Sequence, residues 1–128
     1  SGGNKYALDG VTQKVDTLVK GVKYRFDQSN GTNVNHPLRF STTSNGTHNG
    51  GSEYTTGVTA VGSPGSSGAY TEIILPHSAP STLYYYCTQH SGMGASVQTE
   101  VTAGAGSSTT LQSTVSSTLT LSGATSSR

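Results

Sequence analysis

The sequence lacks tryptophan and has only one cysteine, one methionine and few charged side chains, which make up 10% of its 128 residues. The single cysteine excludes a disulfide within the chain. No apolar run is long enough to cross a bilayer, so we expect no membrane insertion. Seven basic and six acidic residues leave a net charge of +1. Because so weak a field does not attract polyanions, we also expect no nucleic-acid partner.

Glycine, serine and threonine are abundant instead, with 17, 20 and 20 residues. This composition disfavours helices and suits turns and exposed strand faces, so it predicts an all-β fold, and the length suits one domain. Few lysines and glutamates beside many serines, threonines and asparagines are typical of surface proteins, which predicts an extracellular location. The chain starts at Ser1 rather than at a methionine, so we expect a processed product or part of a longer polypeptide.

Alternation of apolar and polar residues predicts a series of short strands. Two alternating segments flank the turn at Lys20-Gly21, which predicts a hairpin with one buried face. The residues that share the inward parity are Val15, Thr17 and Val19 in the first segment and Val22, Tyr24 and Phe26 in the second. In the segment 36–40, His36 shares its parity with two large apolar residues, so its side chain should point into the interior. Further strands are expected near residues 53–58, 69–75, 83–87 and 97–101, and Leu83, Tyr85 and Cys87 share one parity in the third of them. Strands at this short spacing are typical of a β-sandwich.

The composition changes after Ala103. Residues 104–108 contain only glycine, alanine and serine, which predicts a flexible linker between a domain at 1–103 and a tail at 109–128. Within the tail, residues 109–121 alternate like a strand that has no obvious place in the preceding domain. Because a lone strand is not stable by itself, we expect it to pair with a neighbouring copy of the chain or to begin a further domain, and we favour the first.

The only cysteine and the only methionine lie six positions apart, with a histidine midway, in the arrangement Cys87-x2-His90-x2-Met93. A thiolate, two imidazoles and a weak thioether are the donors of mononuclear copper sites that cycle between two oxidation states. The motif supplies one imidazole, and the inward-pointing His36 is the candidate for the second. The predicted metal ligands are therefore His36, Cys87, His90 and Met93.

Three of these residues also have an interpretation without a metal. Without a metal, Cys87 is a buried structural thiol, and His36 is a hydrogen-bonded histidine at the start of a strand. Met93 then fills space at the end of the core. Zinc is the other metal to consider, but structural zinc sites favour several thiolates. We expect His48 and His77 to be solvated, and one of the three tyrosines 84–86 to be in the core. No hydrolase motif brings serine, histidine and aspartate together, so we expect no enzyme.

The stretches "DTLVKGVKYRFDQS", "NHPLRF" and "YYYCTQHSGMG" together resemble the cupredoxin family of small blue-copper proteins over roughly residues 8–102. The resemblance implies an antiparallel Greek-key β-sandwich, here with an extra C-terminal strand, and a mononuclear copper site. Pro37 stands where cupredoxins usually have an asparagine that ties the two ligand loops together, and Asn33 or Asn35 is the candidate to replace it. The residues that flank His90 are polar, unlike the apolar patch with which electron carriers of this family usually dock.

Phrases such as "HPLRFSTTS", "EYTTGV" and "LYYYC" are also similar to a cupredoxin-like module that recurs in structural and fibre proteins of marine phages and aquatic bacteria. This similarity implies a structural module of an extracellular filament, fibre or virion, whose partners are copies of itself or neighbouring subunits. The alternative is a soluble type 1 copper electron-transfer protein.

Overall fold

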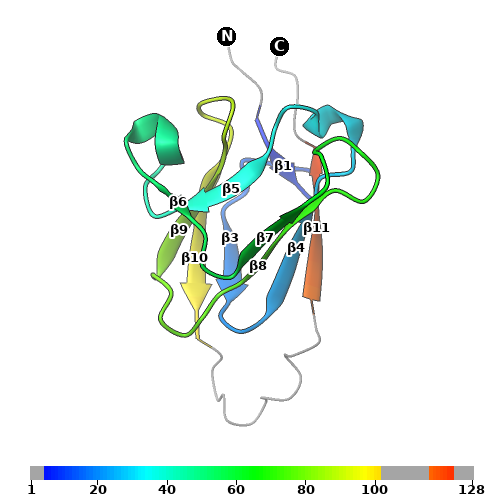
Figure 1. Cartoon of the computed structure of the whole chain (residues 1–128). Coiled ribbons are helices and arrows are strands. Elements are labelled where there is room, and N and C mark those ends of the chain that lie inside the picture. The colour runs from blue at the N-terminus through cyan, green and yellow to red at the C-terminus, as the bar shows by residue number, and fades with distance from the viewer. Residues whose placement is uncertain (1–4, 102–115, 123–128) are drawn as a thin grey trace.

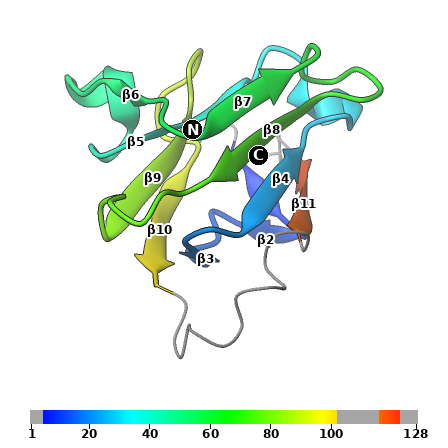
Figure 2. The same cartoon turned by 60° about the horizontal axis from the view of Figure 1, so that its bottom comes forward.

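The computed structural model describes residues 5–101 together with their side chains, and the backbone of residues 116–122 (Figure 1). The described part is all-β, as the composition predicts. It forms a six-stranded sheet and a five-stranded sheet that face each other as a β-sandwich (Figure 2). Two short 3-10 helices, η1 (Gly31–Asn33) and η2 (Gly46–Asn49), lie in the connections.

The chain crosses between the two sheets several times, and several pairs of consecutive strands stay in one sheet. The six-stranded sheet has the order β2 (Val11–Thr12), β1 (Ala7–Leu8), β11 (Ser116–Ser122), β4 (Lys23–Asp27), β8 (Tyr70–Ile74) and β7 (Val58–Val61). The five-stranded sheet has the order β3 (Asp16–Val19), β10 (Ala95–Glu100), β9 (Thr82–Cys87), β5 (Leu38–Ser41) and β6 (Glu53–Tyr54). Most neighbours pair antiparallel, but β3 with β10 and β4 with β11 pair parallel, so the sheets are mixed rather than purely antiparallel.

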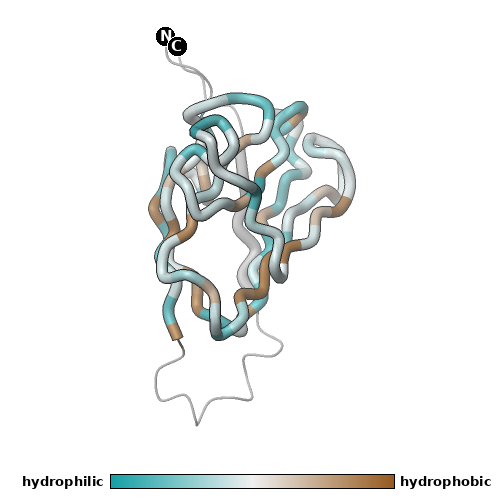
Figure 3. The backbone as a smooth tube through the Cα atoms, turned by 60° about the vertical axis from the view of Figure 1, so that its left-hand side comes forward, coloured by the Kyte–Doolittle hydropathy of each residue, from teal (hydrophilic) through white to brown (hydrophobic). Residues whose placement is uncertain are grey.

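The core lies between the two sheets. Phe26 of β4 and Phe40 of β5 meet across it edge to face, with ring centroids 5.4 Å apart. Buried side chains around this pair come from both sheets and include Leu18, Leu38, Ile73, Leu83, Tyr85 and Val97. The loops at the end where β9 turns into β10 are mostly hydrophilic (Figure 3). The sandwich thus supplies a rigid apolar base beneath a polar end.

The expected hairpin at residues 15–26 is wrong. Its two strands, β3 and β4, belong to different sheets, and the turn between them crosses from one sheet to the other. Backbone bonds fix this crossing: Lys20 N–H donates to the carbonyl of Glu100 in one sheet, and Gly21 N–H donates to Leu75 beside the other. The buried residue of β3 is Leu18, which has the opposite parity to the residues expected to face inward.

The C-terminal strand has a place within the domain, contrary to the expectation for residues 109–121. β11 lies between β1 and β4, with Leu119 opposite Phe26 on one side and Leu121 opposite Leu8 on the other. Residues 116–122 of the predicted tail thus complete the six-stranded sheet of their own chain. The predicted linker 104–108 and residues 109–115 lie outside the described residues.

Candidate metal centre

His36 is fixed by its backbone. It follows η1, and its N–H donates to the carbonyl of Asn33 at 2.8 Å. Its own carbonyl accepts hydrogen bonds from the side-chain amide of Gln28 at 2.6 Å and from the hydroxyl of Tyr6. The residue is 5% exposed, so the inward orientation expected from the sequence is confirmed. A buried imidazole held in this way has a defined direction.

Cys87 and His90 lie where β9 ends and the loop to β10 begins. The Cys87 side chain faces the core and is fully buried, whereas His90 is exposed. Pairing of β5 with β9 places Leu38 opposite Cys87, and Thr88 N–H donates to the carbonyl of Pro37 at 3.2 Å. The sheet therefore brings the His36 segment and the Cys87 loop together, although they lie about fifty residues apart in sequence.

Three of the four predicted ligands converge. The Sγ atom of Cys87 lies 3.6 Å from Nδ1 of His36 and 3.7 Å from Nδ1 of His90. The two imidazole rings have their centroids 4.6 Å apart at an interplanar angle of 49°. One donor atom from each of the three residues lies within 4.8 Å of the others. Among the described residues, this cluster can hold a metal ion.

The spacing of the donors fits a single first-row metal ion. A sulfur at about 2.3 Å and a nitrogen at about 2.0 Å from one ion, at tetrahedral to trigonal angles, lie about 3.5–3.8 Å apart. The two distances of 3.6 and 3.7 Å agree with this separation. Hydrogen bonds from Nδ1–H to sulfur have a similar length. A second argument for a metal site therefore comes from the identity of the three residues. Two imidazoles that aim the same ring nitrogen at one thiol are a typical metal-binding set.

Met93 is fully buried and packs in the same core cluster as Cys87. Its backbone carbonyl accepts a hydrogen bond from Tyr6 N–H at 2.9 Å. Gly94, next in sequence, lies so close to the carbonyl of Tyr85 that a Cβ atom there would be 1.8 Å from the oxygen. Tight packing of this segment brings Met93 back into the sandwich after the exposed part of the loop.

Burial changes the acid-base properties around the cluster. Desolvation, followed by the neighbouring His90 ring, lowers the pKa of His36, which favours the neutral imidazole that metals bind. Desolvation, followed by the charge of Cys87, raises the pKa of Tyr6 well above its ordinary value. The Tyr6 hydroxyl thus keeps its proton and remains a hydrogen-bond donor to the His36 segment.

Gln28 is a residue of the site that the sequence reasoning missed. It is 1% exposed, and its amide donates to the carbonyl of His36 and to Oδ1 of Asn33, while its Oε1 accepts from Leu38 N–H at 3.1 Å. It therefore joins the His36 turn to the start of β5. The sequence contains a signal for this role. Gln28 has the same parity as the inward-facing Phe26, so it places a polar side chain where an apolar one is expected.

Asn33 donates to the carbonyl of Asn30 and accepts from Gln28, which are contacts within the His36 turn. Whether Asn33 or Asn35 ties the two ligand loops together stays a prediction. Side chains of η2 and of the residue before it also reach the ligand loop. His48, expected to be solvated, is exposed on one side, but its Nε2 lies 2.7 Å from the carbonyl oxygen of Cys87.

One of the three tyrosines before Cys87, Tyr85, belongs to the core cluster, as expected, and Tyr86 is buried as well. Tyr85 and Tyr86 are each 1% exposed, although they point to opposite faces of β9. Tyr85 faces the core, where its hydroxyl donates to the carbonyl of Lys14 at 2.8 Å. Tyr86 faces away from the core and is covered by η2, whose His48 ring meets it nearly at a right angle. The 3-10 helix therefore makes a second, smaller buried layer beside the site.

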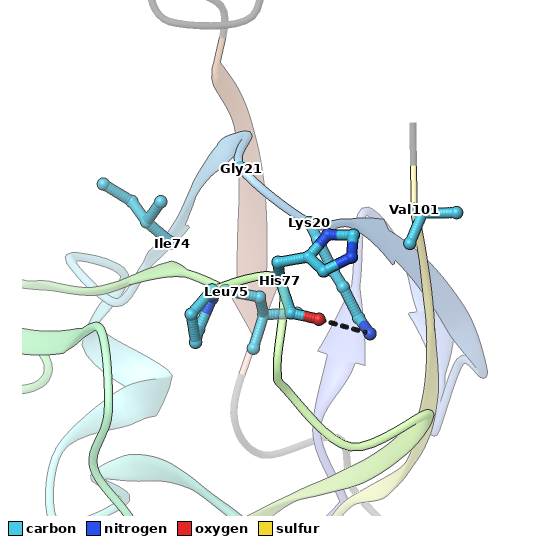
Figure 4. Close-up of a pocket in the computed structure, with 7 residues that line it drawn as sticks. Lys20, Gly21, Ile74, Leu75, His77 and Val101 are labelled. Carbon is cyan, nitrogen blue, oxygen red and sulfur yellow. Dashed lines mark hydrogen bonds between the residues drawn. The ribbon is translucent and has the colours of Figure 1, made fainter. Parts of the chain in front are cut away.

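A separate pocket lies at the opposite end of the sandwich, where β3 turns into β4 (Figure 4). Its cavity volume is about 400 Å³. It is lined by Lys20, Gly21, Ile74, Leu75, Pro76, His77 and Val101. The Lys20 ammonium group donates to the carbonyl of His77 at 3.2 Å, and the rest of the lining is mostly apolar. This pocket is distinct from the candidate metal cluster of His36, Cys87 and His90.

In the part of the chain that the structure describes, no helix has the length and apolar character needed to span a membrane. Comparison with known proteins identifies no relative: no family model, no curated protein and no solved structure matches the chain. The function of the chain is therefore inferred from the geometry of the cluster and from the fold that holds it.

Proposed function

We propose that this chain is a cupredoxin-like β-sandwich module that binds one copper ion through His36, Cys87 and His90, with Met93 as a weak fourth ligand. The observation that supports this proposal is the convergence of two Nδ1 atoms on the Cys87 sulfur at 3.6 and 3.7 Å. Copper supplies reversible one-electron chemistry when it is bound by such donors.

The donor set favours copper over zinc. Structural zinc sites use several thiolates or two thiolates with two histidines, whereas the described residues provide one thiolate, Cys87. Thiolate and thioether donors are soft and select copper, and Met93 is buried in the cluster that contains Cys87. The family resemblance of the sequence agrees with this choice.

The protein holds these donors in place before any metal arrives. Gln28 and Tyr6 both bond to the carbonyl of His36, which fixes the direction of its ring. Burial of Cys87 and His36 excludes water from one side of the cluster, whereas the exposed His90 leaves the other side open to metal ions from solvent. Preorganisation of this kind reduces the free energy needed to assemble a site.

The biological role that we propose is that of a structural module in an extracellular filament, fibre or virion, with copies of the same chain as partners. The position of β11 supports this role. It is the central partner of both β1 and β4, yet it follows the rest of the domain only after residues 102–115. A strand supplied in this manner can come from its own chain or, by strand exchange, from a neighbouring copy.

A soluble electron carrier is the alternative, and the exposed His90 favours it. An imidazole that is a metal ligand at one edge and meets solvent at the other gives electrons a short path to a partner protein. Its neighbours Gln89 and Ser91 are polar and exposed, however, which gives a docking partner little apolar surface. We therefore place this role second, and we propose no enzymatic activity.

Copper titration tests the proposed site. Addition of copper(II) to the wild-type chain should produce an intense visible absorption band from thiolate-to-copper charge transfer at a stoichiometry of one. Cys87→Ser should lose the band, whereas His77→Gln, which changes an exposed histidine outside the cluster, should retain it. A wild-type protein without the band would refute the copper site. Reversible electrochemistry of a strictly monomeric copper protein would favour the electron carrier over the structural module.

A further inference from the structure

The turn before β6 contacts both ends of the loop that carries the ligands. Asn45, immediately before η2, accepts a hydrogen bond from Gly92 N–H at 2.8 Å through its Oδ1 and donates to Ser91 Oγ at 2.9 Å. Three residues later, His48 Nε2 lies 2.7 Å from the carbonyl oxygen of Cys87. The loop between Cys87 and Gly92, which contains His90, is therefore held at its beginning and at its end.

The turn itself has a rigid position on the sheet. Asn45 adopts a left-handed conformation with φ 63°, which asparagine tolerates better than most residues. The next residue, Gly46, is buried against the Tyr86 ring, and a Cβ atom there would lie 2.6 Å from three of its carbons. The ring of His48 packs edge-on against the same tyrosine. Contacts with a buried residue of β9 thus fix the side chains that reach the loop.

We propose that Asn45 and His48 are positioning residues of the metal centre, which hold the ligand loop so that His90 faces Cys87 before the metal binds. This inference rests on the proposed function for its effect on copper. The Nε2–H tautomer of His48 donates to the Cys87 carbonyl. At the other end of the loop, the Asn45 side chain accepts a hydrogen bond from Gly92 N–H.

The positions of these bonds support a role in orienting the metal ligands, in addition to stabilising the fold. By contrast, two other side chains bond to the far end of the loop: Lys5 Nζ donates to the carbonyl of Gly92 at 3.0 Å, and Gln13 Nε2 donates to that of Gly94 at 2.8 Å. The bond from His48 falls on the carbonyl of the cysteine itself. Loss of outer contacts that orient metal ligands typically weakens metal binding about 10–100-fold.

The test uses the full chain with paired variants. Asn45→Gly removes both side-chain bonds and keeps the left-handed backbone free of strain, whereas Asn45→Asp retains an acceptor for Gly92 N–H and for the Ser91 hydroxyl. His48→Ala removes the bond to Cys87, and His48→Gln keeps an N–H donor. Asp9→Gly is the matched control, because Asp9 is exposed, adopts φ 51° and lies in a different turn.

Two measurements are made on each variant. Copper(II) affinity is obtained from the thiolate-to-copper band in competition with a chelator, and hydrogen exchange of the Gly92 amide is followed by NMR in the metal-free protein. We expect Asn45→Gly and His48→Ala to bind copper about 10–100-fold more weakly and to shift the band, with recovery in the Asp and Gln variants. The Gly92 amide should exchange faster in Asn45→Gly than in the wild type, Asn45→Asp or Asp9→Gly.

Unchanged copper affinity and unchanged Gly92 exchange in Asn45→Gly would overturn the inference. Equal loss of affinity in Asp9→Gly would also overturn it, because the effect would then come from chain flexibility. If the wild type binds no copper, the proposed function fails, and the exchange of the Gly92 amide alone decides whether Asn45 holds the loop. The conservative variants keep the test valid if Asn45→Gly or His48→Ala does not fold.

Discussion

Tyr6 bonds to both segments that carry the candidate ligands: its hydroxyl donates to the carbonyl of His36, and its backbone N–H donates to the carbonyl of Met93. The side chain is fully buried. The next two residues form β1, which pairs with the C-terminal strand β11. The N-terminal segment therefore connects the end of the sandwich that carries the candidate ligands to the strand that completes the larger sheet.

Replacement of Tyr6 by phenylalanine should destabilise the fold mildly and weaken copper binding. The ring and the backbone bond remain, and Gln28 still donates to the His36 carbonyl, so we expect a loss of about 1 kcal/mol in the free energy of unfolding, measured in urea. Tyr85→Phe is the control, because it removes a similar bond, to Lys14, away from the cluster. Equal copper affinities of the two variants would contradict a role for Tyr6 at the site.

The two histidines should differ in their response to added imidazole. His90 is exposed, so His90→Gly opens a position that a free imidazole can reach from solvent, and the ligand should restore the thiolate-to-copper band. His36 follows η1 and is only 5% exposed, so His36→Gly should not be restored at the same imidazole concentration. The measurement is the band intensity across an imidazole titration. Equal rescue of both variants would mean that burial does not distinguish the two positions.

Met93→Leu separates packing from ligation. The two side chains have similar volumes, so the substitution should cost less than about 1.5 kcal/mol in the free energy of unfolding. If the thioether is a weak fourth ligand, the variant should retain the visible band and change its reduction potential, because the axial ligand tunes that potential. An unchanged potential, measured by voltammetry of the copper-loaded variant, would assign Met93 to the core alone.

Gly94 should tolerate no side chain. A Cβ atom at this position would lie 1.8 Å from the Tyr85 carbonyl oxygen and 2.7 Å from its carbon. Because these are backbone atoms of the neighbouring strand, they cannot move aside cheaply, and we expect Gly94→Ala to lose about 3 kcal/mol of unfolding free energy. Gly31→Ala is the control, since no atom lies within 4 Å of a Cβ there. Similar chemical denaturation midpoints for the two variants would contradict the close approach.

Alternation in the sequence located the residues that face the core beside the site. The shared parity of Leu83, Tyr85 and Cys87 is confirmed by their burial, and so is the inward position of His36. These predictions succeed because side-chain direction along a strand is a local property. Met93 is buried as well, but whether it binds a metal stays a prediction.

The sequence could not reveal which strands become neighbours. The hairpin expected at residues 15–26 is wrong because alternation does not give the partner of a strand, and the chain crosses between sheets at Gly21. In β3 alternation also indicated the wrong face, since Leu18 is the buried residue. The contacts of Asn45 and His48 with the ligand loop join polar residues about forty positions apart, and no periodic pattern marks such pairs. The place of β11 was missed for the same reason, although the strand itself was expected.

Strand exchange through β11 can be tested by removing and restoring it. A chain without residues 102–128 leaves the facing edges of β1 and β4 unpaired, so it should be less stable than the full chain in thermal unfolding. A synthetic peptide of residues 109–122 should bind to it and raise its unfolding temperature.

Thr118→Pro in the full chain provides the matched case, since Thr118 lies opposite Arg25 in the middle of β11 and proline cannot donate to a neighbouring strand. If neighbouring copies exchange this strand, concentrated wild-type protein should form oligomers on a sizing column. The chain without residues 102–128 and the Thr118→Pro variant should both remain monomeric. Ordered polymers of the truncated chain would show that assembly uses another surface. Absence of oligomers in the wild type would leave β11 as an internal strand of a monomer, which is the arrangement an electron carrier requires.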